Sequence, residues 1–498
     1  MIRMNEISAL LRKISLQSLF DPAAKTFQDQ EIVKGKVLKI YPNSHALLAI
    51  GKMKLTAAVE ADIQAMKTYW FQTEVTESGI RLKLLFPEKD EGHTGRAILE
   101  HFRLPADNTA SQLIDLLLEN EIPFSKKDLA LAINILQSFK GKAPRESLFQ
   151  ALLIAFEKKL PIAEHVIRPL LAVQDEKKLS QLLFQLDEML NNSGRAEDMK
   201  DLNRNLFQLT NLRFLYKAEE VNQILRERND TFSKQLLNKL EFWMKENPLA
   251  IKQLILNENS EQALLQPFTK DKADGSRIGQ MLNAEEKNTL KAMFQQSIHN
   301  VSAQEVKQLL KTAIAKIGLF EHAESSSGQS EWPLKTLLIK YLQNMEHSSL
   351  RGAMERALDY INGQHFMREQ KGPVEQFFIH VPIQLGEQWT DITIQINGKK
   401  DETEKINPNF CRIVFSLYLK EIKETVVDVF IQNRAVKVTI YNDILEESDI
   451  VQHLGSLQEN LKQINYVLTG VSIQKGKTDE QTQKVISGQP YQKVDIKI

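Results

Sequence analysis

The stretch IVFSLYLKEIKETVVDVFIQNRAVKVTIYNDILEESDIVQHLGSLQENLKQINYVLTGVSI, residues 413–473, is the most informative part of the chain for the fold. Apolar and other residues alternate along its first half, which is typical of strands that have one buried face. Residues 432–434 separate two such runs, and Asn433 tolerates the positive φ that a tight turn needs. We therefore predict a β-hairpin with two facing stripes: Val427, Val429 and Ile431, and Val436, Val438 and Ile440.

The second half of the stretch changes from a period of two to a helical period. Its apolar residues are spaced by four, three, four, three and four, which predicts one long amphipathic helix. Gly470, which has no Cβ, is expected to end this helix, and residues 471–473 form a closing strand. The apolar stripe consists of Ile450, Leu454, Leu457, Leu461, Ile464 and Leu468.

A single helix packed across one face of a sheet is a stable two-layer unit. The sequence thus predicts a C-terminal sheet covered by one long helix, in the order strand–strand–helix–strand. The other face, with Phe430, Lys437 and Tyr441, would remain available to a partner. Further strands are expected at residues 377–385, 389–396, 410–419 and 493–498.

The N-terminal part also has the pattern of short strands. Five apolar runs within about sixty residues predict a small barrel, because an open sheet of this size would leave its edges bare. Such barrels can bind oligonucleotides, but Tyr69, Trp70 and Phe71 are adjacent rather than spread along a groove, which favours a core role. The runs are residues 31–41, 45–50, 53–60, 69–76 and 80–86.

Between the two β regions, residues 96–363 have helical periodicity. Residues 116–133 and 154–171 share an apolar helix end, an Ile/Leu-Pro step and a second helix. We predict two helical hairpins that turn at Pro123 and Pro161. Ser125 with Asp128, and Ser302 with Glu305, resemble N-terminal capping pairs.

The predicted fold class is a multidomain α+β protein: a small N-terminal β-barrel, a helical middle of hairpins and the C-terminal sheet. The expected divisions are residues 1–90 (an N-terminal helix and the barrel), 96–323 (helical), 331–363 (a helical pair) and 373–498 (the C-terminal domain).

The composition and the absence of known motifs argue against a catalytic, metal or cofactor site. The 64 basic and 64 acidic residues balance, so no global field attracts nucleic acid or anionic lipid. The histidines form no metal-binding spacing, and the glycines form no phosphate-binding motif. Cys411 could pair with His380, but a buried structural cysteine is favoured. We predict a non-enzymatic protein without catalytic, metal or cofactor sites.

The location of the protein is predicted from three further features. Arg12 and Lys13 interrupt the N-terminal apolar residues, so no secretory leader is expected. No apolar run reaches the roughly 18 residues that a membrane span needs. A single cysteine in 498 residues suits a reducing compartment. The expectation is a cytoplasmic protein, with no membrane span and no nucleic-acid partner.

The C-terminal part resembles the C-terminal domain of the flagellar hook-length control protein family, in a divergent Gram-positive form. The resemblance depends on the pattern PIQL-x-x-x-W-x-D-x-x-I-x-I (382–396), Leu417 with Ile422, the hairpin, the long helix and L-x-G-V-S-I (468–473). The N-terminal pattern V-x-G-K-V-L-K-I (33–40) also resembles the front segment of some members. A Leu-Gly step typical of the family is absent, since Leu419, Ile422 and Lys423 occupy those places.

The resemblance implies a regulator of substrate specificity in flagellar type III export, whose C-terminal domain contacts the cytoplasmic domain of the export-gate switch protein. The helical middle lacks the composition of a secreted, extensible ruler, which favours a cytoplasmic relative without the ruler. Export through a flagellar type III apparatus stays open as the alternative to a cytoplasmic location. Two alternatives remain: a nucleic-acid-binding adaptor that uses the barrel, and a scaffold without a flagellar role. The predicted partner-binding residues are Leu417, Ile422, Lys423, Phe430, Lys437 and Tyr441.

Overall fold

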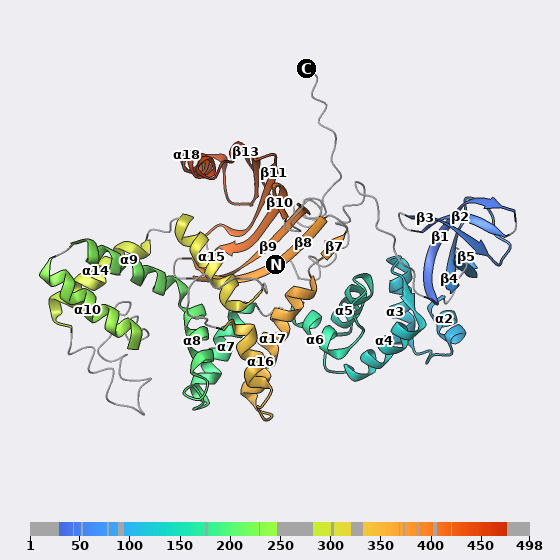
Figure 1. Cartoon of the computed structure of the whole chain (residues 1–498), viewed down its shortest axis with the longest axis horizontal. Coiled ribbons are helices and arrows are strands. Elements are labelled where there is room, and N and C mark those ends of the chain that lie inside the picture. The colour runs from blue at the N-terminus through green and yellow to red at the C-terminus, as the bar shows by residue number, and fades with distance from the viewer. Residues whose placement is uncertain are drawn as a thin grey trace, which may run out of the picture.

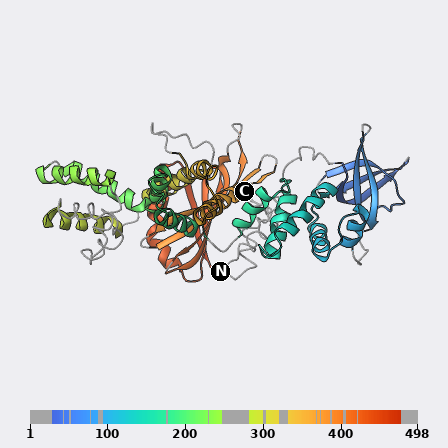
Figure 2. The ribbon, with the colours of Figure 1, turned by 90° about the horizontal axis from the view of Figure 1, so that it is seen from below.

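The chain forms an elongated molecule with three regions, seen in Figure 1 and from below in Figure 2. The β-barrel lies at one end, helices α9, α10 and α14 lie at the other, and the C-terminal sheet with its helices lies between them. This computed structural model describes residues 29–475 apart from residues 43, 51–52, 77–78, 88–93, 175–177, 229, 247–281, 300–302, 320–331, 368, 372–373, 386–387, 402–405 and 420. The predicted N-terminal helix and the predicted strand at 493–498 fall outside the described residues.

The N-terminal barrel is closed and has five strands, as the sequence predicts. Its order is β2-β3-β5-β4-β1, and β1 also pairs with β2. Tyr69 and Phe71 belong to the barrel core, whereas Trp70 faces the neighbouring helices, and all three are buried. Their predicted core role is confirmed. The strands are β1 (Glu31–Tyr41), β2 (His45–Ile50), β3 (Met53–Val59), β4 (Thr68–Thr76) and β5 (Gly79–Pro87).

The barrel is joined to the helical middle by a short strand. β6 (Phe124–Ser125) pairs with the start of β1, opposite Glu31 and Ile32. Ser125 then caps the following helix, because its Oγ accepts a hydrogen bond of 3.1 Å from the backbone N–H of Asp128. The expected capping pair at Ser125 is therefore confirmed.

The helical middle begins with the two predicted hairpins, α3–α4 around Pro123 and α5–α6 around Pro161. Later helices continue the array. Their bounds are α2 (Thr94–Phe102), α3 (Asn108–Glu119), α4 (Lys126–Ser138), α5 (Arg145–Glu157), α6 (Glu164–Ala172), α7 (Leu179–Asn192), α8 (Lys200–Thr210), α9 (Leu212–Arg228), α10 (Thr231–Glu246), α14 (Ala284–His299), α15 (Ala303–Ile317), α16 (Leu334–Leu342) and α17 (Ser349–Met367).

Two separate hydrophobic cores support these helices. The first core extends from Ile32 and Trp70, at the edge of the barrel, through α2–α8 and α15–α17 to β8 and β9. The second core lies at the far end, where α9, α10 and α14 pack around residues such as Phe214 and Phe294. Helix α9 contributes to both, because Leu212 belongs to the first core and Phe214 to the second.

A buried ion cluster fixes α9 against α15. Arg213 Nε lies 2.9 Å from Glu305 Oε1, and Lys217 Nζ lies 2.7 Å from Glu305 Oε2. All three side chains are at most 4% exposed. The sequence predicted that Glu305 would help Ser302 to cap α15. Ser302 lies outside the described residues, so this capping pair stays a prediction, and Glu305 forms these ion pairs.

The C-terminal sheet has seven strands in the order β13-β12-β11-β10-β9-β8-β7. Neighbours are antiparallel except β12 and β13, which are parallel and are connected through α18. The bounds are β7 (Glu369–Lys371), β8 (Val374–Leu385), β9 (Gln388–Lys400), β10 (Ile406–Leu419), β11 (Lys423–Gln432), β12 (Ala435–Tyr441), α18 (Glu447–Gln463) and β13 (Val467–Gln474).

The predicted hairpin is confirmed in register and turn. Val429 lies opposite Val438, so the two expected stripes share one face. Asn433 and Arg434 both have positive φ, of 49° and 65°. This combination is typical of the type I′ turn, whose twist matches that of the flanking strands.

The predicted end of α18 is wrong. The helix ends at Gln463, and Leu468 and Gly470 belong to β13. Asn465 has a φ of 62°, and the N–H of Tyr466 donates to the carbonyl of Leu461. The N–H of Asn465 donates to the carbonyl of Lys462. This is the Schellman arrangement, in which Asn takes the left-handed position that glycine more often occupies.

Candidate protein-binding surface

Side chains of the C-terminal sheet are more deeply buried on β8 than on β11. On β8, successive residues from Phe378 to Ile383 are all buried. Successive side chains of a strand point to opposite faces, so both faces of β8 are covered. On β11, by contrast, the residues from Val427 to Ile431 are only half buried. This part of β11 is therefore more accessible than β8.

Helices α7 and α17 cover one face of β8 and β9. Tyr360 of α17 forms a hydrogen bond of 2.7 Å between its hydroxyl and Nδ1 of His380, and the N–H of His380 donates to Oε1 of Gln364. Ser180 of α7 donates its backbone N–H and its hydroxyl to Asp391, and Phe184 meets the edge of Trp389. Helix α15 also contacts β8.

Burial changes the acidity of these polar groups. His380 is fully enclosed, and the loss of solvation lowers its pKa to about 4. Burial likewise raises the pKa of Asp391, although its hydrogen bonds from Ser180 act in the opposite direction. Both groups are structural partners of the helices, because each one is bonded to α17 or α7.

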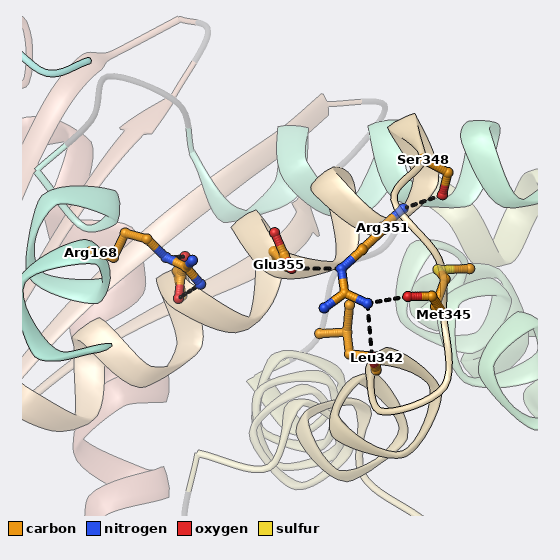
Figure 3. A network of polar contacts seen from close by, with 7 residues as sticks. Arg168, Leu342, Met345, Ser348, Arg351 and Glu355 are labelled. Atoms are coloured by element: carbon orange, nitrogen blue, oxygen red, sulfur yellow. Dashed lines mark hydrogen bonds and ion pairs between the residues drawn. The ribbon is translucent and has the colours of Figure 1, made fainter. Parts of the chain in front are cut away.

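The helices below the sheet are held by a second set of polar contacts, shown in Figure 3. Arg351 donates to the side chain of Glu355 and to the carbonyls of Leu342 and Met345, which closes the α16–α17 connection. Arg168 of α6 forms two hydrogen bonds, of 2.9 and 3.3 Å, with the carboxylate of Asp359 in α17. These contacts fix α17 from both sides.

Beyond β9, one face of the sheet carries a group of aromatic side chains, which we call the aromatic face. Phe430 of β11 lies directly opposite Lys437 of β12, and Tyr441 lies opposite Val426. The ladder with β10 is regular from Phe410 to Leu419, so alternate β10 residues share this face. Its aromatic members are Phe410 (47% exposed), Tyr418 (52% exposed), and the half-buried Phe430 and Tyr441.

An ion pair lies among these aromatic residues. Arg412 and Asp428 form two parallel hydrogen bonds of 2.8 and 2.9 Å. Their side chains are 22% and 14% exposed, so the pair is shielded but reachable. Burial, and secondarily the negative charge of Asp428, raise the pKa of Tyr441. The face thus combines apolar rings, a fixed charge pair and the exposed Lys437, and its aromatic residues and arginine are types that are enriched in protein interfaces.

The structure divides the six predicted partner-binding residues into two groups. Phe430, Lys437 and Tyr441 lie together on the aromatic face. Leu417 points to the opposite face, where it packs against the first core. Ile422 lies in the turn before β11, and Lys423 begins β11 with a φ of 58° and its Nζ 5.9 Å from the ring centre of Tyr418.

Sequence reasoning missed two features near this surface. Phe410 and Tyr418 alternate in register with Arg412, and a regular β10 ladder would have placed them on the same face as Phe430. The expected cover of the sheet by this long helix is not confirmed, because none of the residues of α18 is buried, and exposed apolar side chains lie around it. They are Ile444 (49%), Val451 (64%), Ile464 (58%) and Val467 (64%).

Asn442 connects the end of β12 to the turn before β11. Its side-chain nitrogen donates to the carbonyls of Ile422 and Glu424, at 2.6 and 3.0 Å. Its side-chain oxygen accepts from the N–H groups of Ile444 and Leu445. A single amide thereby fixes the loop that leads into α18.

The part of the chain that the structure describes contains no cluster of three or more His, Cys, Asp or Glu residues suited to a metal. Cys411 and His380 point to opposite faces of the sheet on strands separated by β9, so they do not pair. Burial raises the pKa of the Cys411 thiol. No helix within the described ranges is both long and apolar enough to cross a membrane.

Comparison with known proteins gives one distant relative. The uncharacterized protein YlqG of Bacillus subtilis (strain 168) is 22% identical over 549 aligned positions, which cover 94% of this chain and 94% of the relative. The similarity therefore includes the barrel, the helical middle and the C-terminal sheet. No protein-family model and no solved structure matches the chain.

Proposed function

We propose that this protein is a non-enzymatic regulator of flagellar-type type III protein export, which acts through contact of its C-terminal domain with a protein partner. By resemblance, this partner is the cytoplasmic domain of a flagellar-type export-gate switch protein. The order of elements supports the proposal, because a hairpin is followed by a helix and by a strand that is parallel to the second strand of the hairpin. In this proposal the C-terminal domain, which includes α18, contacts the partner.

The observation that carries the proposal is the aromatic face. Tyrosine, arginine and other large side chains contribute most of the binding energy in protein interfaces, usually around a partly desolvated centre. Here Phe430, Tyr441 and the Arg412–Asp428 pair lie together on a part of the sheet that helices α7 and α17 do not cover. On a strand covered by helices on both faces, the same residues would be fully buried.

A binding experiment tests both the surface and the class of partner. The full chain is incubated with the purified cytoplasmic domain of an export-gate protein, and the Kd is measured by calorimetry. The double variant Phe430→Ala/Lys437→Glu should raise the Kd by about tenfold or more, which corresponds to at least about 1.4 kcal/mol. Thermal unfolding of the variant verifies that the sheet is intact.

A matched control changes the same residue types on α10, outside the C-terminal sheet. Phe242 and Lys245 are exposed on α10. The variant Phe242→Ala/Lys245→Glu should bind with unchanged affinity. Equal affinity of the wild type and the Phe430/Lys437 variant would reject the aromatic face, and failure of the wild type to bind would reject this class of partner.

A further inference from the structure

The barrel carries a surface that the sequence alone does not reveal. In a regular strand, two residues three positions apart point to opposite faces. Lys36 and Lys39 of β1 would then be separated, one outside the barrel and one inside. The ladder between β1 and β2 is instead interrupted between Val37 and Lys39. This β-bulge adds one residue and brings both lysines to the outer face.

The pairing of β1, β2 and β3 places nine residues in three rows on this face. Ala46 and Leu48 are fully buried, so their neighbours on β2 point outward. The rows contain no acidic residue. They are Lys36, Ala49 and Lys54; Lys39, Leu47 and Thr56; and Tyr41, His45 and Ala58. We call these nine residues the lysine face.

The lysines on this face are exposed, and a small residue separates two of them. Lys36, Lys39 and Lys54 are all exposed, and the half-buried Ala49 lies between Lys36 and Lys54. Lys67 is also exposed and lies next to Lys36, because its carbonyl accepts a hydrogen bond of 2.9 Å from the N–H of Val37. On this part of the lysine face, a small side chain therefore lies among positively charged side chains.

Aromatic and apolar groups accompany the charge. The Nζ of Lys39 lies 5.2 Å from the ring centre of Tyr41, and Tyr41 lies opposite the exposed His45. Met66 is 65% exposed and lies beside β1, because its N–H donates to the carbonyl of Val37. A flat ring beside lysines offers a stacking platform for a nucleobase.

Two carboxylates that are close to these strands in the sequence are engaged elsewhere. Glu60 follows β3 and forms an ion pair of 3.2 Å with Arg81 on β5. Glu31, at the start of β1, is buried where β6 joins the barrel. Figure 1 shows the barrel at the end of the molecule, with α2 and α3 on the side of β1 and β4.

We propose that the lysine face binds single-stranded nucleic acid. Three neighbouring strands are about 10 Å across, which matches one sugar–phosphate backbone rather than a duplex. The lysines would contact phosphates, and Tyr41 would stack on a base. Small five-stranded barrels are known to bind oligonucleotides across the corresponding strands, which agrees by analogy. The inference is independent of the export function and of the aromatic face, and it departs from the expectation of no nucleic-acid partner.

The test measures the affinity of the full chain for a fluorescent 15-nucleotide oligo-dT at several salt concentrations. Each phosphate contact contributes about −0.7 to the slope of log K against log salt for single strands, so three lysines give a slope near −2. The variant Lys36→Ala/Lys39→Ala/Lys54→Ala should lose about tenfold or more of the affinity at low salt, and its slope should approach zero.

A control with the same change of charge separates this face from general electrostatics. Lys126, Lys140 and Lys142 are exposed on the helical middle. Their triple alanine variant should retain the affinity and the slope of the wild type. An equal loss in both triple variants, or no binding by the wild type at about 50 mM salt, would overturn the proposal.

A second readout distinguishes nucleic acid from other polyanions. Tyr41→Ala should weaken binding of oligo-dT by about fivefold or more, since stacking contributes about 1–3 kcal/mol per base. It should leave the weak binding of poly-glutamate unchanged. If poly-glutamate or phosphatidylserine vesicles bind as tightly as oligo-dT, and Tyr41→Ala affects none of them, the face is a general anion surface and the proposal fails.

Discussion

His380 makes the stability of the C-terminal sheet dependent on pH. It is 4% exposed on β8, and burial lowers its pKa to about 4 from the ordinary value of 6.5. Between these two pH values the unfolded chain binds a proton at His380 that the folded chain does not. Stability is therefore complete above about pH 6.5 and falls as the pH decreases toward 4, by up to about 3 kcal/mol from this residue.

The measurement compares urea unfolding of the wild type and His380→Gln between pH 7 and pH 5. The stability advantage of the wild type over the variant should shrink by about 2 kcal/mol over this range. The buried Asp391 has a raised pKa and contributes with the opposite sign, but it is present in both proteins and cancels in the difference. A constant difference across the range would contradict the assignment.

At the scale of elements, α17 and α6 approach each other closely at one glycine. A Cβ built on Gly363 would lie 2.2 Å from the carbonyl oxygen of Pro169 in α6. Gly363→Ala must therefore push two helix backbones apart, and we expect a loss of about 1–3 kcal/mol in the free energy of unfolding. Gly352, in the same helix, provides the control, because its Cβ would meet no atom nearer than 3.5 Å.

Gly352→Ala should be neutral or should stabilise the protein by up to about 1 kcal/mol, since alanine favours the helix. Chemical denaturation of both variants gives the two values. Equal effects at the two positions would show that helix propensity, rather than the contact between α6 and α17, determines the outcome.

Elements whose geometry follows from local chemistry were predictable. Asn433 indicated the hairpin turn, and Pro123 and Pro161 indicated the helical hairpins. Where two residues compete for one role, the sequence misled: Asn465, not Gly470, takes the left-handed position that ends α18. The bulge beyond Val37 was not predictable, because a bulge depends on pairing with β2 and leaves no mark in the alternation of β1 alone.

At the scale of the whole molecule, the candidate site depends on which strands the helices cover. Strands β8 and β11 both carry apolar runs, yet α7 and α17 pack on the first and leave the aromatic face of the second accessible. This difference is determined by contacts between segments about 200 residues apart, such as Ser180 with Asp391. Alternation placed Phe430 and Lys437 on one face, but it could not show that Leu417 packs on the other.

Because the second core is separate from the first, we predict that α9, α10 and α14 open independently of the C-terminal sheet. Phe294 is fully buried in the second core and stacks on Phe214 at a ring distance of 5.6 Å. Phe294→Ala should cost about 3–5 kcal/mol, and the loss should be confined to α9, α10 and α14. Hydrogen exchange followed by mass spectrometry would detect faster exchange there and unchanged exchange in the C-terminal sheet.

Leu152→Ala gives the reciprocal test, because Leu152 is fully buried in the first core. In this variant, hydrogen exchange should become faster in the helical array that includes α5 and remain unchanged in α10 and α14. The Arg213–Glu305–Lys217 cluster lies where the two cores meet on α9, so it marks the expected boundary. If Phe294→Ala accelerates exchange in β8 and β9 as strongly as in α10, the ion cluster transmits unfolding, and the two cores form one cooperative unit.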